Sequence, residues 1–186
     1  MIPIKHDRLA IGVALMSQRV GFAVLSRERL VTFAVADVGK QRTADGRSLA
    51  FRVGLHRRLK THAVSHLALV PPPVLRQTFA KAAVTVVDEL AREHRLNLQT
   101  YSRVALRRRG GGTYRRLTSG LLVRYPELRA RVRMRTEIPG YRGLTTSHEV
   151  PIWALALAIS AAEQALADAL TPELPLATPD PSSSRL

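Results

Sequence analysis

The sequence predicts an α/β fold, in which a mixed five-stranded sheet of three antiparallel strands and then parallel strands is flanked by helices. Three apolar runs follow one another with only short polar turns between them, as in an antiparallel meander. Two later apolar runs alternate with segments of helical periodicity, which is the order of parallel crossovers. The length of 186 residues suffices for one domain with a hydrophobic core.

The first three strands are expected over residues 9–16, 20–25 and 30–38. The run LAIGVALM at 9–16 is apolar throughout, which is typical of a strand buried on both faces. Polar residues at 17–19 and 26–29 supply the two turns. Because these turns are short, neighbouring strands are expected to run antiparallel.

Two helices and two strands follow along the chain. Ser48 is expected to cap a first helix over 48–62. A fourth strand spans 64–70. Three prolines at 71–73 then force a break, and one of them is expected in the first turn of a second helix, which runs to about residue 94. A fifth strand is expected over 96–104. The connections between the parallel strands are expected to be right-handed.

The chain is expected to form one domain over residues 9–170. Residues 1–8 are a short polar lead-in, and the Pro- and Ser-rich residues 171–186 predict a disordered tail. The last element of the domain is a helix, and Thr146 and Glu149 match the spacing of a capping box at its start.

The charge balance predicts the class of partner. The chain carries 29 Lys and Arg residues against 14 Asp and Glu residues, a formal net charge of +15. An excess of this size favours a polyanion, because each phosphate that a protein neutralises releases condensed counterions. We therefore expect a nucleic-acid partner. A generally basic solubilising surface and an acidic protein partner stay open as alternatives.

The arginines concentrate in a basic insertion around residues 103–140. From Arg103 to Arg135 the sequence holds eleven arginines and one acid. An extended segment over 131–135 would place three guanidinium groups on one face, because side chains alternate along a strand. The alternative is an edge strand that its charges protect from aggregation.

A glycine run lies between the arginines of this insertion. Residues 110–112 would let the backbone approach a phosphate closely, and a helix capped by Thr113 would aim free amides at it. Tyr114 would stack on a base or a sugar. The alternative is a solvated hairpin whose charges bind nothing. The candidate nucleic-acid-binding residues are Arg107, Arg108, Arg109, Gly110, Gly111, Gly112, Tyr114, Arg115, Arg116, Arg131, Arg133 and Arg135.

Several kinds of site are disfavoured by the sequence. It has no cysteine, which removes thiolate metal sites and cysteine nucleophiles and fits a reducing cytoplasm. His56, His62 and His66 fall on a predicted helix, a turn and a strand, so no shared metal site is expected of them. The glycine run lacks the residues of a P-loop. We therefore expect no cofactor, no metal, no membrane span and a cytoplasmic location.

Residues 12–24 carry a short frame that points to a family. They read GVALMSQRVGFAV: a strand, a turn with a basic residue, then an apolar residue and a glycine that open the next strand. This frame, with the element order above, resembles the RuvC/YqgF-like branch of the RNase H-like superfamily, over residues 9–170. In that branch the first strand carries an aspartate in a G-[IV]-D-x-G pattern. Here Ala14 takes the place of the aspartate and Met16 that of the second glycine.

The other acidic positions of that branch are also replaced. A glutamate near the end of the fourth strand corresponds to Val70 or Pro71, and two acids of the last helix correspond to Val150 and Trp153. The family's hydrolysis implies two divalent metals held by several carboxylates, which none of these side chains can supply. The resemblance therefore implies a pseudonuclease without catalytic residues, whose degenerate former active site comprises Ala14, Val70, Val150 and Trp153. Trp153 is expected to fill the emptied site as core.

Three functions follow from these observations. The favoured one is a catalytically inactive RuvC-like domain that binds branched DNA or structured RNA by shape, within a larger complex. The second is a protein-interaction scaffold built on the same fold. The third is an active metal-dependent nuclease with relocated acids, for which Glu149 and Asp37 are the candidates. A homodimer is implied by the resemblance alone.

Overall fold

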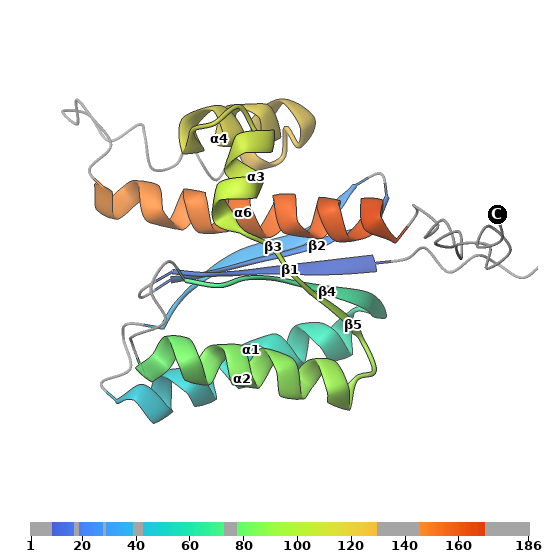
Figure 1. The fold of residues 1–186 in the computed structure, drawn as a ribbon, viewed down its shortest axis with the longest axis vertical. Coiled ribbons are helices and arrows are strands. Elements are labelled where there is room, and N and C mark those ends of the chain that lie inside the picture. The colour runs from blue at the N-terminus through green and yellow to red at the C-terminus, as the bar shows by residue number, and fades with distance from the viewer. Residues whose placement is uncertain are drawn as a thin grey trace, which may run out of the picture.

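A computed structural model describes residues 9–16, 19–27, 29–38, 43–72, 78–129 and 146–169, with the backbone alone at residues 78 and 146–152. The expected fold class is confirmed: a mixed five-stranded sheet carries helices on both faces (Figure 1). The predicted lead-in and tail lie outside the described residues, as do Arg131, Arg133 and Arg135.

The sheet has the order β3-β2-β1-β4-β5. β1 pairs antiparallel with β2, and β2 with β3, whereas β4 runs parallel to both β1 and β5. The meander and the parallel crossovers are therefore as predicted. The strands are β1 (Leu9–Leu15), β2 (Arg19–Leu25), β3 (Leu30–Asp37), β4 (Val64–Val70) and β5 (Asn97–Thr100).

The helices form layers on the two sides of the sheet. In Figure 1, α1 and α2 cover one face, α6 covers the other, and α3 and α4 lie on the outer side of α6. No helix in the described ranges is long and apolar enough to cross a membrane. The helices are α1 (Ala44–Thr61), α2 (Thr78–Glu93), α3 (Arg103–Arg109), α4 (Tyr114–Arg124) and α6 (Thr146–Asp168).

Two predicted boundaries are wrong. Thr43, not Ser48, caps α1: its hydroxyl accepts from the amide of Gly46 at 3.1 Å. Ser48 lies inside the helix, where its hydroxyl donates to the carbonyl of Ala44, as hydroxyls in helices do. The fifth strand ends at Thr100 rather than near residue 104, because the chain turns at Ser102 into α3.

β1 is buried on both faces, as its apolar run predicts. Ala10 and Ala14 belong to the core between the sheet and α6, whereas Ile11, Val13 and Leu15 belong to the core beneath α1 and α2. The alternation follows from the two-residue period of a strand. The sheet therefore separates two hydrophobic cores, with small side chains on the α6 side.

Two glycines let α6 lie directly against the sheet. A Cβ atom on Gly12 would lie 1.8 Å from the carbonyl oxygen of Ala158, and one on Gly21 would lie 2.2 Å from that of Ala154. Because both obstacles are helix backbone, no side-chain movement could relieve the overlap. These two glycines therefore set the distance between α6 and the sheet.

The α3–α4 unit is attached to α6 through apolar side chains. Leu106 of α3 and Leu117 and Leu121 of α4 are buried in the same core as the inner face of α6. We call residues 103–124, which comprise α3, the glycine turn and α4, the arginine hairpin. This packing holds the arginine hairpin against α6, on the same side of the sheet as that helix.

Gly12→Ala should lower the free energy of unfolding by about 3 kcal/mol, because an added methyl group would overlap the backbone of α6. For a chain of this length the melting temperature should fall by roughly 6–12 °C. Thermal unfolding followed by circular dichroism measures the change.

Gly120→Ala is the matched control. Gly120 lies in α4, and nothing would meet an added Cβ within 4 Å. Since alanine favours a helix by up to about 1 kcal/mol over glycine, this variant should be as stable as the parent chain or more so. Equal melting temperatures for Gly12→Ala and the parent would contradict the close seat of α6.

Candidate nucleic-acid interface

Ala14 and Val70 meet at the centre of the sheet. They are register partners in the parallel pairing of β1 with β4, and both are completely buried on the α6 side. Gly21 is the partner of Ala14 on the other side, and it touches α6 at Ala154. The start of α6 that carries Trp153 therefore lies near this pair of strands. Two of the four predicted former acidic positions are adjacent.

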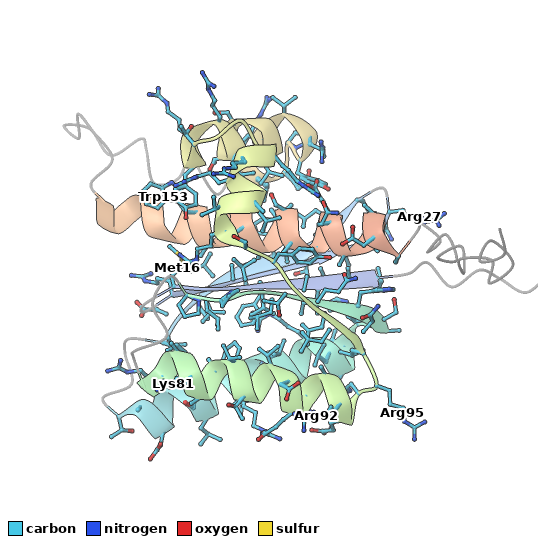
Figure 2. All side chains as sticks on the ribbon, in the orientation of Figure 1. Met16, Arg27, Lys81, Arg92, Arg95 and Trp153 are labelled. Atoms are coloured by element: carbon cyan, nitrogen blue, oxygen red, sulfur yellow. The ribbon has the colours of Figure 1, made fainter. Side chains whose placement is uncertain are left out.

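Trp153 is stacked on Tyr114 of the arginine hairpin. The ring centroids are 4.7 Å apart and the planes differ by 16°. The guanidinium carbon of Arg107 lies 5.7 Å from the centroid of the Tyr114 ring, within range of a cation–π interaction. In Figure 2, Trp153 and Met16 lie toward the same end of α6. This partly buried stack joins α6 to α4, and the expectation that Trp153 fills the former site as core stays a prediction.

The structure describes only the backbone at two other positions of interest on α6. Val150 and Glu149 lie in the first part of the helix, where the backbone alone is described. The prediction that Val150 belongs to the former site, and the alternative that Glu149 is a relocated ligand, therefore fall outside the described side chains.

An arginine that the sequence analysis did not single out bridges the two central strands. Arg103 donates from Nε to the carbonyl of Pro71 at 2.9 Å and from its terminal nitrogen to the carbonyl of Leu15. Burial lowers the pKa of this guanidinium, and a hydrogen bond with Tyr114 opposes that shift. Arginine remains charged even so. A fixed positive charge thus lies where β1 and β4 end.

The glycine turn closes α3 rather than presenting free amides. The amide of Gly112 donates to the carbonyl of Arg107 at 2.8 Å, and that of Gly111 to Arg108 at 3.2 Å. This is the pattern of a Schellman cap, which requires a left-handed residue, and Gly111 has φ +96°. The amides of the glycine run are therefore bonded within the chain, and the expectation that the first amides of α4 face a phosphate stays a prediction. At the start of α4, Thr113 caps as predicted, accepting from the amide of Arg116 at 3.2 Å.

Four arginines of the hairpin are exposed around this turn. Arg108 and Arg109 end α3, and Arg115 and Arg116 begin α4. Within the described part of the chain, none of the four lies in ion-pair distance of a carboxylate; Arg116 donates to the carbonyl of Gly111 at 3.3 Å. The fold therefore gathers four outward guanidinium groups that internal acids do not neutralise.

Arg107 differs from its neighbours because it is partly buried. Its Nε is shielded from solvent and has no hydrogen-bond partner among the described residues. An unsatisfied buried donor costs about 1–3 kcal/mol, so such groups usually meet a water or a ligand. Among the described residues, Nε of Arg107 is thus a buried donor without an acceptor.

A groove of about 550 Å³ runs between the hairpin and the outer side of α6. Arg109 and Arg116 lie along it, as does Arg124, which forms a 2.6 Å ion pair with Glu163 of α6. Tyr125 donates to the same carboxylate at 2.9 Å. Burial, and then the Glu163 charge, raise the pKa of Tyr125, so it stays a neutral donor. In this wall of the groove the charges of Arg124 and Glu163 therefore neutralise each other. The hairpin arginines that lack a described acidic partner lie toward the glycine turn.

Two of the described carboxylates have partners of their own. Asp37, a candidate relocated ligand, pairs with Arg19 at 3.2 Å across β2 and β3. Asp168 accepts from Tyr101 at 2.7 Å near the other end of α6. Within the described ranges, the His, Asp and Glu side chains whose donor atoms gather closely enough for a metal are on α1 and α2, on the opposite face of the sheet.

Comparison with known proteins identifies the fold. No protein-family model matches the sequence, and a comparison with curated proteins gives no match either. Among solved structures, Thermus thermophilus RuvC in complex with a Holliday junction substrate has 15% identity and a TM-score of 0.62, over 86% of this chain and 94% of that one. A second Thermus thermophilus RuvC structure has 19% identity and a TM-score of 0.59, over 86% and 96%.

A eukaryotic protein has the same fold. The yeast mitochondrial Holliday junction resolvase Ydc2 has 10% identity and a TM-score of 0.50, over 89% of this chain and 83% of that one. The three likenesses cover 86%, 86% and 89% of this chain. The chain therefore has the RuvC-like RNase H fold.

Proposed function

We propose that this chain binds nucleic acid through the arginine hairpin and does not cleave what it binds. The observation that carries the proposal is the group of exposed arginines around the glycine turn, which the described acids leave unpaired. Guanidinium groups offer bidentate, permanently charged contacts that match phosphate oxygens. Their gathering on one hairpin suits a sugar–phosphate backbone better than a single small anion.

The stack beneath these arginines supports the same assignment. Tyr114 is held between Trp153 and the guanidinium of Arg107, so its orientation is fixed before any ligand arrives.

Recognition is proposed to depend on the shape of the nucleic acid. Contacts from arginine to phosphate position a protein but carry no sequence information. Branched DNA is the first candidate because one structural relative holds a Holliday junction substrate, an argument by analogy of fold. Structured RNA is the second, since its phosphates can present a comparable cluster of charge.

The absence of cleavage is proposed from what occupies the centre of the sheet. Two divalent metals need several converging carboxylates, and the adjacent Ala14 and Val70 carry only apolar groups. The guanidinium of Arg103 lies at the ends of the same strands, where its charge would repel a cation. Both features disfavour an ion at this place.

A protein-interaction role is a second candidate function, favoured by one observation on the opposite layer. Leu49 and Val53 of α1 are 63% and 53% exposed, and they line a groove of about 720 Å³ whose rim includes Arg57. An acidic amphipathic segment of a partner protein would fit this combination of exposed apolar and basic side chains.

The first test compares substrates. The chain should bind a four-way junction or a structured RNA more tightly than linear duplex or single-stranded DNA, and two junctions of unrelated sequence should bind alike. Electrophoretic mobility shift across a salt series measures both properties. Affinity should fall steeply as salt rises, because phosphate contacts release counterions. No shift at low salt, or a shift that salt does not weaken, would refute the proposed partner.

The second test locates the interface. A quadruple alanine variant of Arg108, Arg109, Arg115 and Arg116 should bind more weakly, and the slope of log K against log salt should become shallower by about 3–4 on duplex-like substrates. The control removes four exposed charges from the other layer: Arg57, Lys60, Lys81 and Arg92. Figure 2 shows Lys81 and Arg92 on that side of the molecule.

The control variant keeps the same net charge as the hairpin variant, so total charge cannot explain a difference between them. If the two variants lose affinity equally, binding follows overall charge. If the control loses more, the interface lies on α1 and α2, and the assignment to the arginine hairpin is wrong.

The third test addresses catalysis. Incubation with a four-way junction, duplex, single strand and structured RNA in Mg²⁺ or Mn²⁺ should give no product above a protein-free control, because apolar side chains lie on the central strands and a guanidinium lies at the ends of those strands. An active junction resolvase is the positive control. Metal-dependent cleavage that Glu149→Gln abolishes would establish instead a nuclease with a relocated acid.

A further inference from the structure

We propose that His56, Glu93 and His94 form a binding site for a divalent transition metal of the zinc class. The site joins α1 to the end of α2, on the face of the sheet opposite the arginine hairpin (Figure 1). It takes no part in the nucleic-acid binding proposed above and stands on its own observations.

The three donor atoms are spaced as ligands of one ion. Nε2 of His94 lies 3.2 Å from Nδ1 of His56, which lies 3.8 Å from Oε1 of Glu93, and all three atoms are within 4.8 Å of one another. Two nitrogens bound tetrahedrally to Zn²⁺ at 2.0–2.1 Å would be about 3.3 Å apart. The spacing of the two histidines is therefore already that of a zinc site.

The chemistry of the donor set is selective. Two imidazoles and one carboxylate are a common zinc ligand set, and imidazole ligands distinguish such a site from the oxygen-only sites of Mg²⁺ and Ca²⁺. The side chain of His56 is 30% exposed and that of Glu93 is 49% exposed, so an ion can enter from solvent. Three protein ligands leave a fourth position for water.

The backbone around His94 is held in place. The amide of His94 donates to the carbonyl of Leu90, and the chain then reverses at Arg95, which has φ +54°. The amide of Leu96 closes this turn on the carbonyl of Ala91 at 2.8 Å. A left-handed non-glycine residue is kept in place only by its surroundings, so His94 sits on a tightly defined helix end.

Glu93 is oriented from its other oxygen. Arg52 of α1 lies 3.7 Å from Oε2 of Glu93 and also pairs with Glu89, while Oε1 of Glu93 is turned toward His56. A second group that fixes an unused ligand atom is a usual feature of metal sites. The bound ion would link the two helices and stabilise the folded chain in proportion to its concentration.

The test uses the full chain after treatment with a chelator and dialysis. Titration with ZnCl₂ by isothermal calorimetry should show saturable binding of one ion per chain, and added zinc should raise the melting temperature. Co²⁺ should give the visible absorption of a tetrahedral site with nitrogen ligands. His56→Gln and His94→Gln should each weaken zinc binding at least about tenfold, as loss of groups around a metal does. Both should lose the zinc-dependent rise in melting temperature.

Two further variants secure the interpretation. Glu93→Gln changes an exposed side chain, so it should fold normally yet bind zinc more weakly. His62→Gln changes a histidine at the end of α1 outside the cluster and should bind zinc like the parent chain. Absence of saturable zinc binding, or equal binding by the parent, His56→Gln and His94→Gln, would overturn the proposal. Circular dichroism in the presence of chelator verifies the fold of each variant.

Discussion

The contact between α6 and the two central strands is the constraint on which the rest of this structure depends. Gly12 and Gly21 bring the helix backbone so near the sheet that only hydrogen fits at these positions. Small residues on the facing side of α6, among them Ala154 and Ala158, complete the close approach. The close approach stabilises the fold through dispersion contacts along the whole helix, because atoms of the helix and of the sheet lie at packing distance. The position of α3 and α4, which pack on the outer side of α6 (Figure 1), follows from this contact.

The proposed binding surface depends on this contact indirectly. The arginine hairpin packs through leucines onto α6, and Trp153 joins Tyr114 above the strands that carry Ala14 and Val70. Arg103, the first residue of the hairpin, donates hydrogen bonds to carbonyls at the ends of those strands. The exposed arginines thus stand on a base secured both through packing and through hydrogen bonds. Such a base suits recognition of a rigid, branched or folded ligand, because little ordering entropy is lost on binding.

Features that follow from the burial of apolar residues could be predicted from the sequence. Features that follow from contacts between residues far apart in the chain could not. The first four strands and the place of Thr113 follow from local periodicity and capping chemistry. Ser48 and Thr43 are equally good caps by type, so the choice between them needed the true start of α1. Nothing local marks Arg103 among the neighbouring arginines. His56 and His94 are 38 residues apart, and only the packing of α1 on α2 brings them together.

The bridge from Arg103 to Leu15 and Pro71 has a consequence for the physiology of the domain. An ion at a sheet's centre comes and goes with its supply, so a protein that depends on one exists in several charge states. A guanidinium is covalently part of the chain, and arginine does not titrate in the physiological range. The positive charge that Arg103 places at the ends of β1 and β4 is therefore permanent and does not vary with the supply of an ion.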